Sequence, residues 1–208
     1  MRIKTVMVHL LVSLIFLSAC APAASAEPVA PTATQPVPTA PVETGGPEYY
    51  PLSTRTGIPD VDAVLAAVES GDPQALRDLV RYTTVGCTNA EGLGGPPKCR
   101  EGEAEGTLVN VLPFLGSEGH FLHESELSSF PGVNVIGLYA VYVVSDSAYS
   151  EEAYTTGEYA AMFTTEDDQT VIVLQIREGI VRIDYLYSPT SWGDVIQRDA
   201  SELILAPK

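Results

Sequence analysis

Tryptophan, histidine, methionine and cysteine are scarce in this chain, and so is positive charge. Its 208 residues include one tryptophan, three histidines, three methionines and three cysteines, and 11 basic residues stand against 27 acidic ones. So few cations argue against nucleic-acid binding, because nothing would neutralise the phosphates. The same imbalance argues against a domain that lies flat on an anionic bilayer. High acidity is mainly a signature of solubility.

Sequence signatures of catalysis are missing as well. The chain contains no Gly-rich phosphate loop, no G-x-S-x-G, no HExxH and no repeats of the solenoid kind. We therefore expect no cofactor and no metal, and we favour a domain that is not an enzyme.

An apolar run at the N-terminus is too short to cross a bilayer. Arg2 and Lys4 precede an apolar stretch from Val6 to Leu17, which only His9 and Ser13 interrupt. A charged start followed by a run of this length is typical of a secretory signal. A membrane-spanning helix needs about 20 apolar residues.

The run ends in Leu17-Ser18-Ala19-Cys20, which resembles the lipobox of bacterial lipoproteins. The resemblance implies a signal peptide at residues 1–19, cleavage before Cys20, and acyl chains on that cysteine. The mature protein would then be anchored in a cell membrane by lipid and face the extracytoplasmic side, with the lipid bilayer as a partner. An ordinary secretory signal cut after Ala24 or Ala26 is the alternative.

Residues 20–56 are expected to form a tether behind the lipidated cysteine. Eight prolines lie between Ala21 and Pro51, interspersed with Ala, Thr and Val. Such a segment favours extended conformations and acts as a semi-rigid spacer of about 3.1 Å per residue. The remaining residues, 57–208, are enough for one domain.

Cys87 and Cys99 are the two cysteines left after lipidation. They bracket TNAEGLGGPPK, and outside the cytoplasm two such thiols most simply form a disulfide. A metal site with His120 and His123 is the alternative, but zinc motifs usually place paired ligands two to four residues apart. The sequence therefore predicts a disulfide and no metal.

Two short helices are predicted between Ile58 and Thr83. Asp60 and Asp72 are the expected N-caps, and Gly71 separates the helices. The apolar stripe of the first helix is Val61, Val64, Leu65 and Val68, and that of the second is Leu76, Leu79 and Val80.

Strands dominate the remainder. A strand is expected from Thr107 to about Pro113 and a short helix at 124–130, and four period-2 segments follow, at 133–145, 157–165, 169–177 and 179–187. Short turns join the last three into an antiparallel meander. The predicted class is α+β, with N-terminal helices packed on one face of a curved, mainly antiparallel sheet.

Two segments carry a family resemblance. AVESGDPQALRDLV and IREGIVRIDYLYSP resemble the first and last elements of the nuclear-transport-factor-2-like, or polyketide-cyclase-like, cone domains. The resemblance implies a cone-like sheet. The catalytic Tyr/Asp pair of that family cannot be placed on any residue of this chain.

Arg182 and Asp184 are the best candidate ligand-binding residues. Two positions apart on one strand, they point to the same face. They form either a surface ion pair, which solvated alternation in antiparallel sheets favours, or part of a pocket in which Arg182 holds an anion. Tyr139 and Tyr142 are further candidates for a pocket wall, although tyrosine is also an ordinary strand residue. The single tryptophan, Trp192, is expected to plug the end of the sheet.

Three functions are consistent with these features. The leading hypothesis is a lipid-anchored, non-enzymatic binding or accessory domain for an unknown small molecule or envelope protein. The alternatives are a small isomerase- or cyclase-like enzyme with acid–base chemistry in a conical pocket, and a structural envelope protein.

Overall fold

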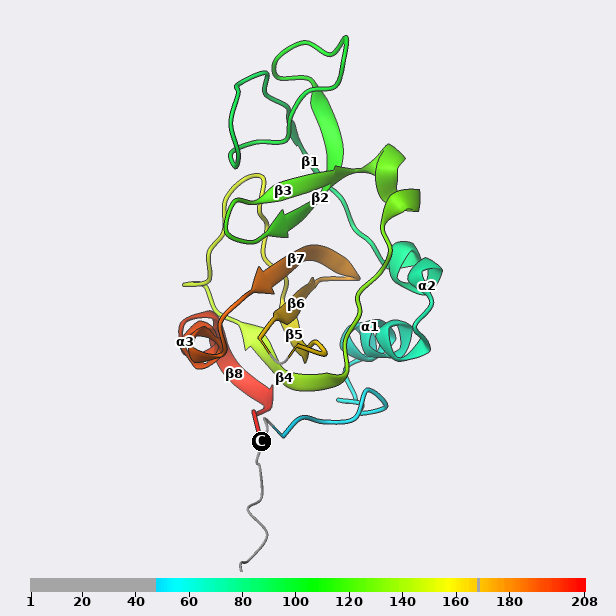
Figure 1. The fold of residues 1–208 in the computed structure, drawn as a ribbon, viewed down its shortest axis with the longest axis vertical. Coiled ribbons are helices and arrows are strands. Elements are labelled where there is room, and N and C mark those ends of the chain that lie inside the picture. Colours follow the sequence, from blue (N-terminus) through cyan, green and yellow to red (C-terminus); the bar gives the residue numbers. More distant parts are fainter. Residues whose placement is uncertain (1–47, 168) are drawn as a thin grey trace, which may run out of the picture. The chain divides into compact units, whose positions relative to one another are not determined.

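The computed structural model describes residues 48–167 and 169–208, and Figure 1 shows how their helices and strands are arranged. In chain order the elements are α1 (Pro59–Ser70), α2 (Pro73–Asp78), β1 (Thr83–Gly86), β2 (Leu108–Leu115), β3 (His120–His123), the 3-10 helix η1 (Glu124–Ser129), β4 (Gly137–Val144), β5 (Tyr159–Thr164), β6 (Val171–Ile176), β7 (Ile180–Leu186), α3 (Pro189–Asp199) and β8 (Ala200–Leu205). All of them fall within one compact unit. The predicted signal peptide and the predicted tether up to residue 47, Cys20 included, lie outside the described residues.

The α+β class with a mainly antiparallel sheet is confirmed. Among the described residues one eight-stranded sheet has the order β1-β2-β7-β6-β5-β4-β8, and β3 pairs with β2 beside this path. Every pairing is antiparallel except the short contact of β2 with β7. The predicted meander is present as β5, β6 and β7, and β4 extends it by one antiparallel strand.

α1 forms where the sequence predicted it, but its N-cap differs. The helix begins at Pro59 after Ile58, and no side chain caps it, so the prediction of Asp60 as N-cap is wrong. Asp60 lies in the first turn, where a negative charge still complements the helix dipole. The buried side chains of α1 are the predicted stripe and Ala67: Val61, Val64, Leu65, Ala67 and Val68.

α2 begins as the sequence predicted. The side chain of Asp72 accepts a hydrogen bond from the backbone N–H of Gln74 at 2.9 Å, and Pro73 occupies the first turn. The helix is only six residues long, so Leu79 and Val80 of the predicted stripe follow it instead of belonging to it.

The β6–β7 turn depends on a glycine. Gly179 has φ 139°, and a Cβ there would lie 2.2 Å from the carbonyl oxygen of Leu79. That oxygen accepts a hydrogen bond from the N–H of Ile180 at 2.8 Å. The close approach ties the end of α2 to the start of β7, and a side chain at residue 179 would prevent it.

β2 continues past the proline at which the sequence predicted its end. Pro113 pairs with Phe121 of β3, and the pairing with β7 begins only at Phe114. Proline is tolerated at this position because the pairing with β7 has not yet begun there, so no hydrogen bond to β7 needs its missing N–H. The short helix expected at 124–130 is present as η1.

Two apolar clusters lie on opposite faces of the sheet. The first joins α1 to one face and contains Leu65, Leu138, Phe163, Leu174 and Ile183, all with at most 1% exposure. The second joins α3 to the other face and contains Tyr142, Met162, Val173 and Trp192. α1 and α3 accordingly flank the sheet from two sides in Figure 1.

The helix on the second face adds to the predicted arrangement of N-terminal helices on one face. α3 and β8 were not predicted, and they follow directly on one another near the C-terminus. β8 pairs antiparallel with β4 and so extends the sheet edge, while Trp192, Val195 and Ile196 of α3 fill the second cluster. Burial of Trp192 at 2% exposure removes its ring from solvent.

Folded structure begins upstream of residue 57, the expected start of the domain. Tyr50 pairs with Leu138 through two backbone hydrogen bonds of 2.8 and 2.9 Å, and its hydroxyl donates to the carbonyl of Ala206 at 2.9 Å. Leu52 packs against the first apolar cluster. Residues 50–52 thus belong to the body of the domain.

The predicted disulfide between Cys87 and Cys99 is present, with 4.8 Å between the Cα atoms. Cys87 is buried against Val85, Val109 and Tyr154, so the bridge belongs to a third apolar cluster. Within residues 48–167 and 169–208 no helix is both long and apolar enough to span a membrane.

Candidate functional site

Arg182 and Asp184 lie on the face of β7 that α3 covers. Their alternation puts them on one face, as predicted, but they are 1% and 7% exposed. The favoured interpretation of a surface ion pair is therefore wrong. α3 and the β4–β5 loop remove this face from solvent, whereas solvated alternation assumes that nothing packs there.

The guanidinium of Arg182 connects β7 to the β4–β5 loop. Its Nε and Nη2 donate to the two carboxylate oxygens of Asp184, at 2.7 and 3.0 Å. Its Nη1 donates to the carbonyl oxygens of Tyr149 and Tyr154, at 2.8 and 3.1 Å. The planar fork of arginine suits this bidentate pairing, and it fixes the loop on the sheet.

Gln175 completes this buried network from β6. Its amide nitrogen donates to Asp184 at 3.2 Å, and its amide oxygen accepts from the N–H of Gly157 at 3.1 Å. A Cβ at Gly157 would lie 2.4 Å from the backbone nitrogen of Ile176, so only glycine allows the loop to approach this closely. Side chains of β6 and β7 therefore hold the loop at Tyr149, Tyr154 and Gly157.

A cavity of about 280 Å³ adjoins the network, between β7 and the C-terminal end of α3. Apolar side chains of Leu115, Val173, Leu186 and Val195 form part of its wall. Two ion pairs, Arg182 with Asp184 and Arg198 with Asp199, supply the charged part of the wall, and Gly116, Tyr149 and Tyr185 complete it. This combination of apolar walls and a few placed charges is typical of a small-molecule site.

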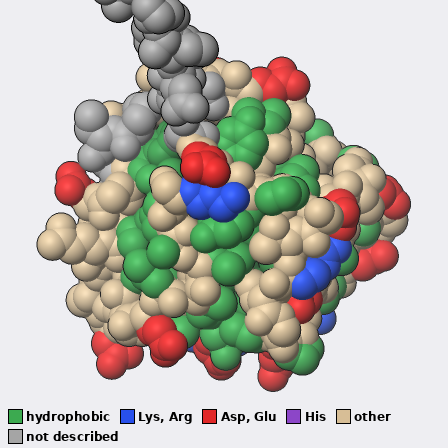
Figure 2. Space-filling model, turned by 90° about the horizontal axis from the view of Figure 1, so that it is seen from below, with side chains coloured by type: hydrophobic (Ala, Val, Ile, Leu, Met, Phe, Trp, Pro, Cys, Tyr) green, Lys and Arg blue, Asp and Glu red, His purple; other side chains and the backbone are tan. Residues whose placement is uncertain are grey.

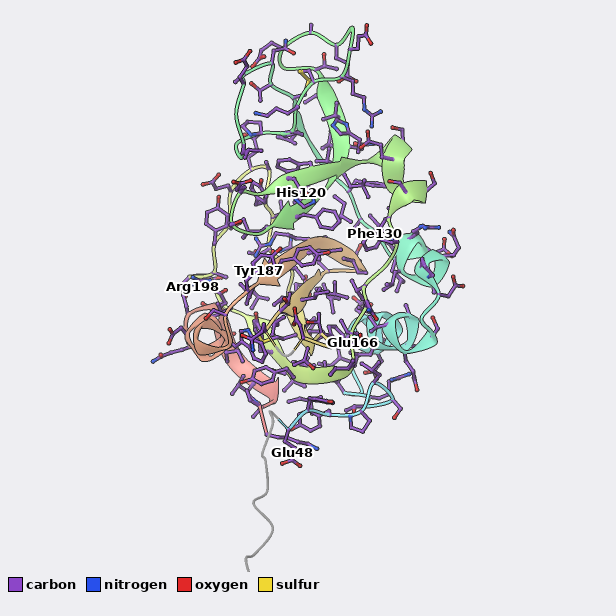
Figure 3. The ribbon with its side chains drawn as sticks, in the orientation of Figure 1. Glu48, His120, Phe130, Glu166, Tyr187 and Arg198 are labelled. Carbon is purple, nitrogen blue, oxygen red and sulfur yellow. A yellow bond between two sulfur atoms is a disulfide. The ribbon has the colours of Figure 1, made fainter. Side chains whose placement is uncertain are left out.

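The second ion pair differs from the first in its exposure. The Nε and Nη2 of Arg198 donate to the two carboxylate oxygens of Asp199, at 2.6 and 2.8 Å. The side chain of Asp199 is 7% exposed, but that of Arg198 is 59% exposed and lies on α3 (Figure 3). Hydrogen bonding to Asp199 raises the pKa of Arg198. Asp199 thus depends on a surface side chain for its neutralisation.

Tyr142, on β4, has no exposed surface and is not among the residues that line the cavity. Its hydroxyl has no hydrogen-bond partner among the described residues, which is costly for a buried donor. Burial raises the pKa of Tyr142 well above its ordinary value, and the nearby carboxylates of Asp199 and Asp184 raise it further. Burial also raises the pKa of Asp184, against the opposing effect of Arg182.

The structure brings three of the four candidate ligand-binding residues together. Arg182 and Asp184 line the cavity, and Tyr142 lies close enough to interact with both their charges. Tyr139 is apart from the cavity: its ring packs edge-on against Trp192, with 5.2 Å between the ring centres. Tyr139, on β4, therefore packs against α3.

Sequence reasoning missed the residues that complete the site, Gln175, Arg198 and Asp199. The segment VIVLQI carries a sequence signal for burial, because a continuous apolar run indicates a strand covered on both faces. All six residues of β6 are buried in the structure. The pairing of Arg198 and Asp199 next to Asp184 depends on the position of α3, for which the sequence carries no local signal.

His120 and His123 do not line this cavity. His120, on β3, stacks on Phe114 with 4.7 Å between ring centres, and Phe130 meets Phe114 edge-on (Figure 3 labels His120 and Phe130). Burial lowers the pKa of His120. Within the part of the chain that the structure describes, no three His, Cys, Asp or Glu side chains are grouped as metal ligands would be.

A larger hollow of about 550 Å³ lies between the two ends of the β4–β5 loop, next to Val143 and Gly157. Its charged side chains, Asp146, Glu158 and Arg177, are all exposed. The smaller cavity, which has buried charges, is therefore the better candidate site.

Comparison with family models, with curated proteins and with solved structures finds no match for this chain.

Proposed function

We propose that this chain is a lipid-anchored extracytoplasmic protein whose folded domain binds a small molecule or an envelope protein without catalysing a reaction. The charged start, the apolar run and Leu17-Ser18-Ala19-Cys20 support the anchor, and the proline-rich segment supports a spacer. The disulfide is consistent with an oxidising compartment. The lipid bilayer would be the partner of the acylated Cys20.

We also propose that the domain is a cone-like relative of the nuclear-transport-factor-2-like group, with its first helices packed on a curved sheet. Support comes from the order of its elements, with α1 and α2 first and the meander of β5, β6 and β7 late in the chain. The disulfide-closed loop, α3 and β8 would then be additions to that plan.

The engaged state of Asp184 is the observation that carries the assignment of binding over catalysis. Both its oxygens accept hydrogen bonds from Arg182, and one also accepts from Gln175. A general base must be able to reach a substrate proton and take it up. A carboxylate bound in this way is suited to orienting a bound group, and the arginine is occupied by the β4–β5 loop.

Native mass spectrometry and a thermal-shift screen of the full chain, against metabolites and cell-wall fragments, test the proposal. A retained ligand or partner that is released unchanged supports it. Reproducible turnover of any added compound would overturn it.

An acid–base enzyme of the isomerase or cyclase type is the second candidate. One observation favours it: Asp184 lies in a partly apolar cavity, and burial raises its pKa. Buried carboxyls with raised pKa values are common at catalytic sites. If this candidate is correct, Asp184→Asn will abolish turnover of a compound found in the screen at temperatures at which the variant, although destabilised by the loss of the ionic partner of Arg182, is still folded.

A further inference from the structure

Two buried carboxylates face the same cavity from different elements. Asp184 comes from the middle of β7 and Asp199 from the last residue of α3, and the residues are 7% and 5% exposed. They are close enough for the charge of Asp199 to disfavour ionisation of Asp184. Each is paired with an arginine, Asp184 with Arg182 and Asp199 with Arg198, so a further positive charge is attracted strongly only if it replaces one of these arginines.

The hydroxyl of Tyr142 is a buried polar group that has no partner among the residues described, and it lies close to the same two carboxylates but outside the cavity lining. A buried hydroxyl without a partner is unusual in a folded protein. A polar group that Asp184 and Asp199 hold in the cavity would lie on the same face of the sheet as the hydroxyl of Tyr142.

The arginines of the cavity are poorly placed to bind an anion. Arg182 already donates hydrogen bonds to Asp184 and to the carbonyl oxygens of Tyr149 and Tyr154. Arg198 is bound to Asp199 by two donors, and any anion would have to compete with that carboxylate. Because its side chain is 59% exposed, however, Arg198 can move into solvent when another cation takes its place at the buried Asp199.

The rest of the wall and the charge of the whole chain favour an organic cation. Leu115, Val173, Leu186 and Val195 present apolar surface to the cavity, and its volume of about 280 Å³ limits the ligand to a small molecule. The chain carries 27 acidic against 11 basic residues, and acidic side chains ring the face shown in Figure 2. Such a field raises the local concentration of cations.

We propose that this cavity binds a small primary amine. Its ammonium group takes the place of Arg198 at Asp199 and also contacts Asp184, and its apolar body packs against Leu115, Val173 and Leu186. This inference rests on the proposed binding function and names the ligand class of the same site.

Calorimetric titration of the full chain with three compounds of one apolar body tests the proposal: 2-phenylethylamine, 2-phenylethanol and 3-phenylpropionate. The amine is expected to bind at least tenfold more tightly than the other two. Asp199→Asn is expected to weaken amine binding at least tenfold. Asp194→Asn, which removes an exposed carboxylate of the same helix outside the cavity, is the matched control and leaves it unchanged.

Arg198→Gln gives the sharpest result, because loss of the competing cation is expected to strengthen amine binding severalfold. An anion site would respond in the opposite direction. Because Arg198 is mostly exposed, this variant remains informative even if Asp199→Asn fails to fold.

Tighter binding of the propionate or the alcohol than of the amine overturns the amine assignment and leaves the binding function standing. Weaker amine binding by Arg198→Gln, or unchanged binding by a folded Asp199→Asn, overturns it too. Failure of all three compounds also counts against the amine, and the wider ligand screen then decides the binding function separately.

Discussion

Replacing Arg182 by methionine is predicted to destabilise the domain severely. Methionine keeps an unbranched apolar stem, shorter than that of arginine, and leaves the buried carboxylate of Asp184 without its ionic partner. It also removes the donors to the carbonyl oxygens of Tyr149 and Tyr154, which hold the β4–β5 loop. The variant therefore affects the sheet and the loop together.

The magnitude follows from the burial of the pair, whose side chains are 2% and 11% exposed. Breaking a buried ion pair by removing one partner costs about 3–5 kcal/mol. With a urea m-value of about 2 kcal/mol/M, the unfolding midpoint should fall by roughly 1.5–2.5 M. Replacing both partners, as in Arg182→Met with Asp184→Leu, removes the stranded charge and should recover most of this loss, since apolar replacement of a buried pair is often neutral.

Urea unfolding followed by the fluorescence of Trp192 measures this effect, because the only tryptophan is buried against the sheet. Arg177→Met is the matched control. The side chain of Arg177 is 49% exposed, and its Nε lies as far as 3.9 Å from the Oε1 of Glu158, so loss of this ion pair should cost less than about 1 kcal/mol. An Arg182→Met midpoint equal to that of the control would refute the reasoning. A double variant less stable than the single one would also contradict it.

Three further predictions concern other parts of the domain. Replacing Cys87 and Cys99 by serine should cost about 3 kcal/mol of unfolding free energy and lower the thermal midpoint by roughly 6–12 °C, measured by circular dichroism; an unchanged midpoint would show that the loop needs no bridge. Hydrogen bonds, first from the Thr165 hydroxyl and then from nearby backbone N–H groups, hold the pKa of Asp167 well below 3.8. The contribution of Asp167 to stability is therefore present above pH 3.8 and fades as the pH falls further. Unfolding midpoints of the native chain and of Asp167→Asn should converge at low pH, and a constant gap between them would contradict this account. Burial lowers the pKa of His120 below 6.5, so an NMR titration should find its midpoint under that value, and Phe114→Ala, which exposes the ring, should raise it; a midpoint above 6.5 would not fit the stacked geometry.

Local patterns predicted much of the fold because each depends on a few neighbouring residues. The stripe of α1, the Asp72 cap and the strands β5, β6 and β7 follow from spacing alone. α3 was missed although Trp192, Val195 and Ile196 have helical spacing and a proline stands in its first turn. The glycine at residue 193 disfavours a helix, and the packing of Trp192 on the sheet offsets that cost.

The candidate site was predicted only in part. Alternation placed Arg182 and Asp184 on one face, and the usual solvated face of an antiparallel sheet predicted that this face is exposed to water. What covers a face is a tertiary property, here decided by α3 and by the β4–β5 loop that Arg182 binds. Asp199, fifteen residues beyond Asp184, joins the site only because α3 ends there.

The central claim, a binding domain moored by acyl chains, is tested most directly by labelling cells with radioactive palmitate. The native chain and a variant with both Cys87 and Cys99 replaced by serine are predicted to carry the label and to sediment with membranes. Cys20→Ser is predicted to lose the label and the membrane association. An unlabelled native chain, or a Cys20→Ser chain that is processed and sediments like the native one, would contradict the account.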